Sequence, residues 1–497
     1  MGLSGKPRGA PTIGVNIGSS LIKVVEAKPG KDGILITALG VAPTPPGTIE
    51  NEIIVDPQTL GQAIRQLIKE SGITCKRCVS SVSGQSTVVV RIIEVPKMTP
   101  KELAETMKWE VERHVPFAAN EVVMDFQAID RPMVGGDDQN MEVLLAVAQQ
   151  EVINRHIEAI YAAGLDPVII DVEPLAICRA LIDASKNGER EQTIAIVNIG
   201  AAVTDMGIYQ NGLLAFPRTL PIAGDSITRA ISDGLNIPID QAERLKRERA
   251  TVLMDRAASL NPHMGFGAPE TDDDQGVPDA TIAVPAPANG APAGEEDPGF
   301  IPGLGFGFGA EPEPESSAAN GTPDFDVDLG GGATGMPFMD FDLADSDAAA
   351  PVAPAAPKVD LSEPMDAAAV SMPATTGADG FAPAVDDAQL AAFTDEQIFD
   401  AIGPMLNDLI MEMRRSFEYY ASRFQTQPDK ILLCGGTSKM KDLDKLIQAE
   451  LGVPVVVGNP LENVTVFSRT LSQDYLTEVA SVFPVGVGLA IRDMLGE

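Results

Sequence analysis

Two short stretches of the sequence combine an asparagine, a glycine and small residues in an order that suits phosphate binding. Residues 16–20 read N-I-G-S-S and residues 198–202 read N-I-G-A-A, each between two apolar runs. This order predicts strand, tight turn and strand, because glycine allows a turn in which successive backbone N–H groups stay open to an anion. A single turn of this kind is usually a plain hairpin. Two of them, about 180 residues apart, predict a duplicated fold that clamps a nucleotide between its halves.

The elements around the first turn form a series of strands interrupted by one helix. Apolar periodicity predicts a hairpin at 13–26, strands at 33–41, 78–82 and 87–95, and an amphipathic helix at 56–71. A unit of helix, two strands and helix follows at 99–164. Thr99 is its expected N-cap, Pro100 its first helical residue and Glu102 the capping-box partner. This unit is predicted to be a small inserted subdomain.

The second turn is followed by similar elements, separated by a long interruption. We expect a hairpin at 194–212, a strand at 212–220, helices at 225–234 and from about 240, a long helix at 396–426, a strand at 431–436, a helix at 442–451, a strand at 453–457 and a terminal helix at 478–494 that is broken near Pro484. The strand at 431–436 runs into a Gly-Gly turn, a third position where the backbone can approach a ligand closely.

The chain is acidic, with a formal net charge of −35, and much of this charge lies in one segment. Residues 256–394 hold about 24 acidic and about 2 basic residues and are dominated by Ala, Pro, Gly and Asp. Such a composition predicts a disordered insertion, acting as a spacer or carrying short docking motifs. The acidic balance disfavours binding to nucleic acid or directly to anionic membranes. Four cysteines, no secretory signal and no bilayer-length apolar run predict a soluble cytoplasmic protein.

Several stretches spread along the chain form a specific combination. They are I-G-V-N-I-G-S-S-L-I-K-V-V-E, R-I-I-E-V-P-K-M-T-P-K-E-L-A-E-T-M-K-W-E-V-E-R-H-V-P-F, D-V-E-P-L-A-I-C-R-A-L, M-R-R-S-F-E-Y-Y, L-L-C-G-G-T-S and V-G-N-P-L-E-N-V. Together they resemble the PilM family of type IV pilus assembly proteins, relatives of the division protein FtsA within the actin-like ATPase superfamily. The resemblance covers almost everything outside the acidic segment.

The resemblance implies an α/β, actin-like ATPase fold of two duplicated βββαβα lobes, with an inserted small α+β subdomain and a long disordered acidic insertion. The expected bounds are a flexible tail at 1–11, lobe I at 12–98 and 165–190, the subdomain at 99–164, lobe II at 191–255 and 395–480, the insertion at 256–394 and a terminal helix returning to lobe I at 481–497.

The resemblance also implies which residues bind ATP. They are Asn16, Gly18, Ser19, Ser20 and Lys23 at the first phosphate loop, Asn198, Gly200, Ala201, Thr204 and Gly224 at the second, and Glu243, Lys246, Gly435, Gly436 and Thr437 around the adenosine. Two alternatives stay open from the residues themselves. Lys23 could be a surface lysine on a half-exposed strand, and Glu243 with Lys246 could be a solvated ion pair within a helix.

The sequence departs from the superfamily pattern at two positions. Relatives usually carry Asp where Asn16 and Asn198 stand, and those carboxylates hold Mg²⁺ through water. An amide offers only a neutral oxygen, so the metal and the attacking water should be placed less firmly. Asp205 could compensate at the Mg²⁺ site, and Glu173 stands where relatives place a residue that orients water. We therefore expect ATP and Mg²⁺ binding with slow or absent hydrolysis.

Three functions fit these expectations. The first is a scaffold for type IV pilus assembly that grips the N-terminal cytoplasmic peptide of a PilN-like protein and lies at the inner membrane through that partner. The second is a slow ATPase, or a sugar or acid kinase, of the same fold. The third is an FtsA-like division protein that forms filaments. Self-association and a partner for the acidic insertion are further possibilities.

Overall fold

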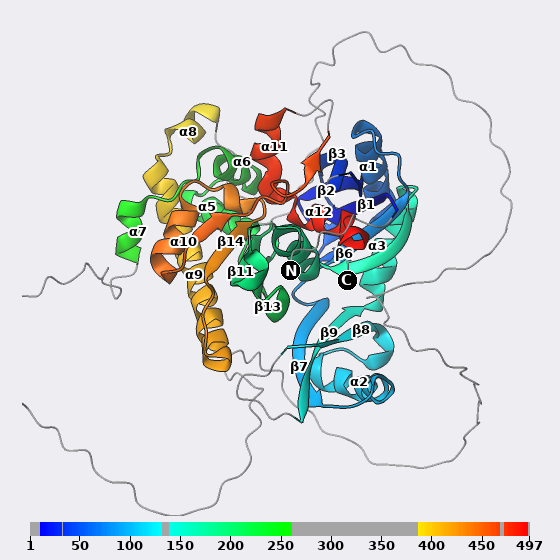
Figure 1. Ribbon diagram of the computed structural model, residues 1–497. Helices are drawn as coiled ribbons and strands as arrows, with labels where there is room; N and C mark the ends of the chain where they lie inside the picture. The colour runs from blue at the N-terminus through cyan, green and yellow to red at the C-terminus, as the bar shows by residue number, and fades with distance from the viewer. Residues whose placement is uncertain are drawn as a thin grey trace, which may run out of the picture. The chain divides into compact units, whose positions relative to one another are not determined.

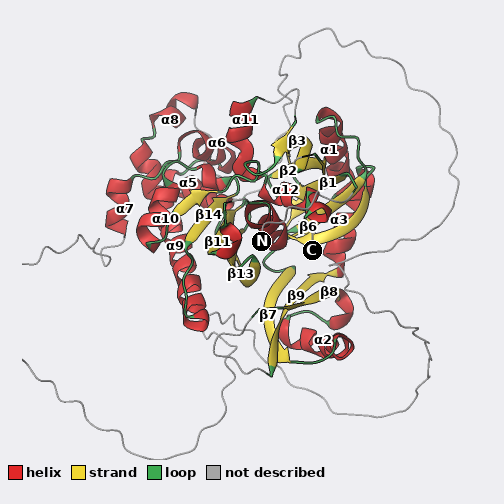
Figure 2. Cartoon of the chain, in the orientation of Figure 1, coloured by secondary structure: helices red, strands yellow, loops and turns green. Residues whose placement is uncertain are grey.

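Three larger β-sheets organise the part of the chain that the structure describes, and a short hairpin of β4 (Ile49–Glu50) and β5 (Ile53–Ile54) forms a fourth (Figure 1, Figure 2). The computed structural model describes residues 10–31, 33–131, 139–185, 187–260, 386–467 and 472–495. These residues belong to one compact unit, Met1–His263 with Pro337–Glu497. Two of the sheets are mixed and large, with six and five strands, and the third has three antiparallel strands.

The six-stranded sheet of lobe I has the order β10-β6-β1-β2-β3-β16. Its strands are β1 (Thr12–Ile17), β2 (Leu21–Pro29), β3 (Ile34–Pro43), β6 (Arg77–Val82), β10 (Asp166–Val172) and β16 (Thr465–Val466). β1, β2 and β3 are antiparallel neighbours, whereas β1, β6 and β10 run parallel. Parallel strands end at the same edge of a sheet, so the C-terminal ends of β1 and β6 lie together.

Helices cover both faces of this sheet. α1 (Pro57–Glu70) and α3 (Gln150–Ala162) pack on the face that carries Ile13 and Val15. α4 (Glu173–Cys178) and α12 (Pro484–Ala490) lie on the opposite face, where Gly14 and Gly488 leave room for close backbone approach. The terminal helix expected at 478–494 is divided into α11 (Gln473–Val479), a 3-10 turn and α12, because Pro484 starts a new helix.

The five-stranded sheet of lobe II repeats this pattern of pairing. Its order is β13-β12-β11-β14-β15, with β11 (Thr193–Ile199), β12 (Thr204–Gln210), β13 (Leu213–Leu220), β14 (Lys430–Cys434) and β15 (Val455–Val457). β11 to β13 form an antiparallel meander, and β11, β14 and β15 are parallel. The helices are α5 (Gly224–Leu235), α6 (Ile239–Arg249), α9 (Asp395–Phe424) and α10 (Leu443–Leu451). The same topology in both sheets agrees with the two similar glycine turns in the sequence.

The third sheet, β7-β9-β8, belongs to a subdomain whose first and last elements are not those expected from the bounds 99–164. Its strands are β7 (Val88–Pro96), β8 (Val122–Ile129) and β9 (Asn140–Gln149), and α2 (Pro100–His114) packs on it. The expectation placed β7 in lobe I, but β7 pairs along its whole length with β9. The expectation placed α3 in the subdomain, but α3 packs on α1, where Gly61 lets the two helices approach closely. Local patterns predicted these elements but not their partners.

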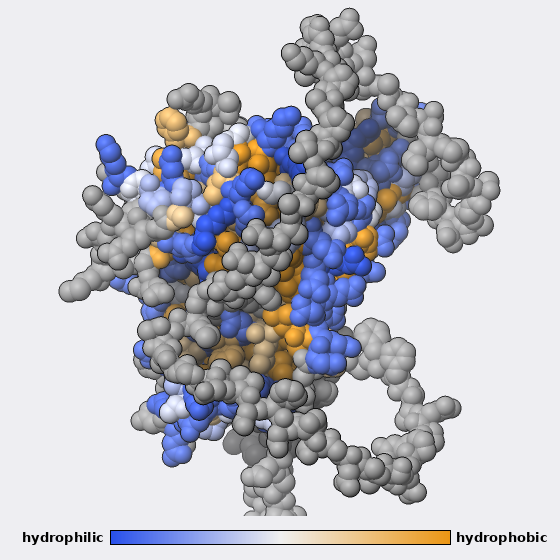
Figure 3. Space-filling model, turned by 90° about the vertical axis from the view of Figure 1, so that its right-hand side faces the viewer, coloured by the Kyte–Doolittle hydropathy of each residue, from blue (hydrophilic) through white to orange (hydrophobic). Residues whose placement is uncertain are grey.

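The start of α2 follows its expected cap. The Thr99 hydroxyl accepts a hydrogen bond from the backbone N–H of Glu102, and the Glu102 carboxylate accepts one from the backbone N–H of Thr99 at 2.8 Å. Further along this helix Trp109, the only tryptophan of the chain, is 73% exposed. Apolar residues also reach the surface elsewhere, and on the face shown in Figure 3 they form patches bordered by polar residues.

The end of α9 joins lobe II to the three-stranded sheet. Arg423 contacts Glu94 at 2.5 Å and Glu142 at 3.5 Å, and Arg131 also pairs with Glu142. Both guanidinium groups lie 5.3 Å from the centre of the Phe424 ring, a cation–π arrangement. The subdomain therefore contacts lobe II as well as the lobe I strand that leads into it.

The edges of the expected insertion at 256–394 are helical, which corrects its predicted bounds. α7 (Met254–Leu260) and α8 (Asp387–Ala392) are ordered, and Leu390 of α8 is buried in the core of lobe II. Asp387 pairs with Arg244 of α6 at 2.5 Å. An apolar anchor and complementary charge explain why the prediction of disorder went too far at this end. Residues 261–385 lie outside the described residues.

Candidate functional site

A cavity of about 560 Å³ lies between the two lobes, and most of the predicted nucleotide residues line it. They come from segments far apart in the sequence: Asn16, Gly18, Ser19, Ser20 and Lys23 from lobe I, and Asn198, Gly200, Ala201, Gly224, Glu243, Lys246, Gly435, Gly436 and Thr437 from lobe II. Glu173 and Asp205 line it as well. Thr204 does not. It is fully buried, and its hydroxyl donates a hydrogen bond to the carbonyl of Ile222 at 2.7 Å.

The two glycine turns close in the same way. The N–H of Gly18 donates to the carbonyl of Leu21 at 3.0 Å, and the N–H of Gly200 donates to the carbonyl of Val203 at 3.0 Å. In the second turn, the carbonyl of Gly200 also accepts from the Thr437 hydroxyl at 3.2 Å. This last bond ties the second turn to the diglycine bend after β14. Each turn therefore presents small residues to the cavity from a fixed backbone.

The two glycines of the bend have different roles. Gly435 has φ +91°, and a Cβ atom there would overlap the carbonyl of Ile199. Any other residue at this position would be strained and would clash. Gly436 has φ −63°, which all residues adopt, and a Cβ atom there would have no neighbour within 4 Å. The space in front of Gly436 is therefore open to a flat ligand.

A carboxyl group is held between the two asparagines at the centre of the cleft. Asn16 Nδ2 donates to Glu173 Oε1 at 2.7 Å, and Asn198 Nδ2 donates to Glu173 Oε2 at 3.4 Å. Asn16 Oδ1 in turn accepts from Lys23 Nζ at 2.9 Å. Asn16 is the second-to-last residue of β1 in lobe I, and Asn198 is the second-to-last residue of β11 in lobe II. Glu173 thus joins the two lobes through neutral amides.

The ionisation of Glu173 depends on its burial and on the charges of Asp205 and Lys23. Burial, with the nearby Asp205 carboxylate, raises the pKa of Glu173 to about 7, against the opposing effects of Lys23 and the Asn16 hydrogen bond. Burial also lowers the pKa of Lys23, and Glu173 partly counters this. Lys23 lines the cavity and its ammonium group donates to Asn16, so its half-buried side chain faces the cleft.

Asp205 forms a second link between the lobes. Its carboxylate accepts from the Ser83 hydroxyl of lobe I at 2.8 Å and from the Thr219 hydroxyl of lobe II at 2.7 Å. Burial raises the pKa of Asp205, while both hydroxyls lower it. Both oxygens of Asp205 have partners, so a metal-bound water would have to share or displace them.

Glu243 and Lys246 of α6 form a largely buried ion pair with further hydrogen bonds, not a solvated one. Lys246 Nζ lies 2.6 Å from Glu243 Oε2, and it also donates to the carbonyl of Gly224 at 3.0 Å and to the Thr228 hydroxyl at 2.7 Å. The Lys246 side chain is only 14% exposed. These bonds attach α6 to the start of α5, so the helix presents Glu243 and Lys246 to the cavity in a fixed position.

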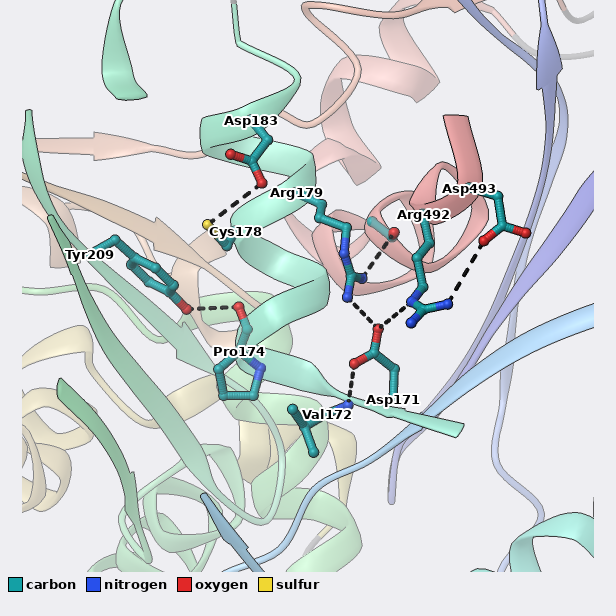
Figure 4. Close-up of polar contacts among 10 residues, drawn as sticks. Asp171, Val172, Pro174, Cys178, Arg179, Asp183, Tyr209, Arg492 and Asp493 are labelled. Atoms are coloured by element: carbon teal, nitrogen blue, oxygen red, sulfur yellow. Dashed lines mark hydrogen bonds and ion pairs between the residues drawn. The ribbon is translucent and has the colours of Figure 1, made fainter. Parts of the chain in front are cut away.

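A buried ionic network supports the helix that carries Glu173 (Figure 4). The Asp171 carboxylate lies between Arg179 at 2.5 Å and Arg492 at 3.6 Å. The Tyr209 hydroxyl donates to the carbonyl of Pro174 at 2.8 Å. These contacts attach α4 to the C-terminal segment and to β12, which fixes the direction of Glu173. None of these positions was predicted, because their roles depend on contacts between distant segments.

Further residues that the sequence analysis missed line the cavity from lobe I. They are Glu52, Ser81, Ser83, Gly84 and His156. His156 Nε2 lies 2.7 Å from the Ser80 hydroxyl, which donates to the carbonyl of Val15, and burial lowers the pKa of His156 to about 4. The polar run S-S-V-S-G at the end of an apolar strand was the available signal. The sequence around His156 gave no signal that this residue lies on the buried side of α3 and at the cavity.

Within the described residues, no group of three or more His, Cys, Asp or Glu side chains is arranged to hold a metal ion directly. Among the oxygen donors that line the cleft are the amide oxygens of Asn16 and Asn198 and the carboxylates of Glu173 and Asp205. Hard oxygen donors of this kind fit Mg²⁺ when water and phosphate complete its shell. These four residues are the ones that would hold it.

The fold is that of the actin-like ATPases, as the sequence predicted. The chain superimposes on the structure titled "PilM-PilN type IV pilus biogenesis complex" with a TM-score of 0.62 and 24% identity, covering 98% of this chain and 99% of that one. Residues 14–264 match the family described as type IV pilus assembly protein PilM, and residues 195–479 match that of cell division protein FtsA. The chain belongs to the PilM family.

Curated relatives are division proteins that match part of the chain. FtsA of Bacillus subtilis (strain 168) is 24% identical over 268 residues, which is 50% of this chain and 59% of the relative. FtsA of Pseudomonas aeruginosa PAO1 is 24% identical over 264 residues, which is 49% of this chain and 62% of the relative. The matches thus span about three fifths of these relatives. Among the described residues, no helix has the length and apolar character needed to cross a bilayer.

Proposed function

We propose that this protein is an ATP-binding scaffold of type IV pilus assembly, in which the nucleotide holds the two lobes in one arrangement. The observation that carries the proposal is that fourteen of the fifteen predicted nucleotide residues line one cavity. Its volume, about 560 Å³, is typical of small-molecule and cofactor sites. The cation of Lys23 would attract the phosphates, and the open space at Gly436, on the side expected for Glu243 and Lys246, would accept the adenosine.

Hydrolysis would be slow or absent, because the groups that activate water in such a site are neutral or occupied. Asn16 and Asn198 supply amides where carboxylates would hold Mg²⁺ through water. Glu173, with a pKa of about 7, is protonated in a large fraction of molecules at neutral pH. Its oxygens are also bonded to both asparagines. Nucleotide would therefore act mainly as a structural ligand.

The partner we propose is the N-terminal cytoplasmic peptide of a PilN-like inner-membrane protein, bound where the three-stranded sheet meets the lobes. A small cavity of about 40 Å³ lies at this junction, between Val88 and Val90 of β7 and Pro217 of β13. Ser83 and Asp205 line both this cavity and the large one. A peptide at the junction would therefore lie close to the nucleotide. Binding it would hold a cytoplasmic protein at the inner membrane.

Two titrations of the full chain test the proposal. ATP with Mg²⁺ should bind the wild type, and Gly436→Leu should abolish binding while leaving the unfolding temperature of the ligand-free protein close to wild type, because the added side chain enters open space. The N-terminal peptide of the PilN-like protein should bind and its scrambled version should not. Absence of ATP binding would reject the nucleotide proposal, and equal binding of both peptides would reject the proposed partner.

The rate of ATP turnover distinguishes the proposed scaffold from the main alternative, an enzyme. A true ATPase or a kinase would release ADP steadily at a rate on the order of 1 s⁻¹ or more, whereas the proposed scaffold would release it far more slowly or not at all. The likeness of residues 195–479 to FtsA keeps a filament-forming division protein as the other candidate. Sedimentation of ATP-dependent polymers would favour it.

A further inference from the structure

Ser81 is a buried polar residue at the cavity that the site described so far does not use. It lies near the end of β6 and is only 2% exposed. Its hydroxyl has no hydrogen-bond partner within the described part of the chain, although the residue lines the cavity between the lobes. Buried hydroxyl groups are nearly always hydrogen-bonded, so an unpaired one at a cavity wall indicates a missing ligand atom.

The strand register shows which way Ser81 faces. β1 and β6 are parallel, with Val15 opposite Ser80. The Ser80 side chain contacts His156 of α3, on one face of the sheet. Because successive side chains in a strand alternate, Ser81 faces the opposite side, as does its neighbour Asn16. On that side Asn16 contacts Glu173.

The neighbouring polar side chains of the described residues do not bond to the Ser81 hydroxyl. The other polar groups of this central cluster bind one another: Lys23 to Asn16, Asn16 to Glu173, and Asn198 to Glu173. Ser81 is left out of this network. Leaving a buried hydroxyl without a partner disfavours folding, so the serine is explained more simply by a bond to a ligand than by a contribution to stability.

We propose that the Ser81 hydroxyl is a phosphate-binding group, donating a hydrogen bond to a phosphate oxygen of the bound nucleotide or to a water molecule of its Mg²⁺ shell. This inference rests on the proposed nucleotide site and adds a residue to it. Ser81 would partly replace the polar contacts that neutral asparagines provide poorly. It is a binding residue supplied by a strand end, in addition to the two glycine turns.

The test measures nucleotide affinity and stability together. Titration calorimetry with ATP, ADP and adenosine, with Mg²⁺ and with EDTA, is compared for wild type, Ser81→Ala and Ser80→Ala. Ser81→Ala should weaken ATP binding about 5- to 10-fold, leave adenosine binding unchanged, and leave the unfolding temperature of the ligand-free protein equal or higher, since it removes an unpaired hydroxyl. Loss of the effect in EDTA would assign the bond to the Mg²⁺ shell, and its persistence would assign it to a phosphate oxygen.

Ser80→Ala is the matched control. It removes a hydroxyl from the same strand that is bonded to His156 and to the carbonyl of Val15, so it should lower the unfolding temperature while changing ATP affinity by less than about 2-fold. Equal ATP affinity in wild type and Ser81→Ala would overturn the inference, and so would an equal loss for adenosine. If the wild type binds none of the three ligands, the proposed function fails first and this inference fails with it.

Discussion

Replacing both central asparagines by aspartate, Asn16→Asp with Asn198→Asp, should make the stability of the protein depend on Mg²⁺. In the wild type these amides donate to the two oxygens of Glu173 at 2.7 and 3.4 Å. The double variant would remove both donors and place two carboxylates beside a third. Asp205 adds a further negative charge that already raises the pKa of Glu173.

The size of the effect follows from these distances. Two like charges about 3 Å apart repel each other by about 5 kcal/mol at an effective dielectric constant of about 20. Protonation limits this cost, because each unit by which a pKa rises costs about 1.4 kcal/mol where the group would otherwise be ionised. We expect the free energy of unfolding of the double variant to fall by about 3–5 kcal/mol at pH 8, and by less than about 2 kcal/mol at pH 5.5, where mutual repulsion keeps part of the clustered carboxyl groups protonated.

The free energy of unfolding of the wild type should also fall as the pH rises, but by less than that of the double variant. The pKa of Glu173 is raised from 4.5 to about 7, so the folded state binds this proton more tightly than the unfolded state. Stability therefore falls as the pH rises through that window, by about 3 kcal/mol in total. The loss is complete above pH 7 and absent below pH 4.5. Neighbouring carboxylates in the double variant extend the window to higher pH.

Urea unfolding at pH 5.5, 7 and 8, with and without Mg²⁺ and ATP, measures these differences. Mg²⁺ should recover at least half of the loss in the double variant and change the wild type less, because the variant adds two carboxylates to those of Glu173 and Asp205 where the wild type has neutral amides. Asn154→Asp, at an exposed position on α3, is the control for a simple change of charge. If the double variant were as stable as wild type at pH 8 without Mg²⁺, or bound ATP and turned it over no better with Mg²⁺, the interpretation of both asparagines would be wrong.

Three further substitutions test the packing around the site. Gly435→Ala should destabilise the protein by more than about 2 kcal/mol in thermal unfolding, because its φ of +91° and its clash with a carbonyl both oppose a side chain, whereas Gly436→Ala should change stability by less than about 0.5 kcal/mol. Glu142→Ala should cost about 3–5 kcal/mol in urea unfolding, because it leaves the buried Arg131 without its carboxylate; a loss below 1 kcal/mol would contradict this. Tyr209→Phe should cost about 1 kcal/mol through the lost hydrogen bond at α4, and a neutral result would show that this bond does not hold the helix.

The sequence alone was sufficient for most local elements and for fourteen of the fifteen nucleotide residues to be placed at one cleft. The hairpins around Gly18 and Gly200 and the capped start of α2 follow from local periodicity and from the special backbone of glycine and proline. Such features depend on residues that are close in the chain, so their signals survive in a single sequence. The repeated Asn-Ile-Gly pattern further indicated that two distant turns belong together, and the fold confirmed the superfamily.

Tertiary structure decided the pairings and the chemical environments. β7 joined the subdomain because β9 offered a full-length partner, which no local pattern specifies. Thr204 turned away from the cavity, although the family resemblance implied a place in the second phosphate loop. The Glu173 carboxyl acquired a pKa of about 7 only because burial and Asp205 act on it together. Burial, register and the distance between charges are properties of the assembled chain, and for that reason they could not be predicted from the order of its residues.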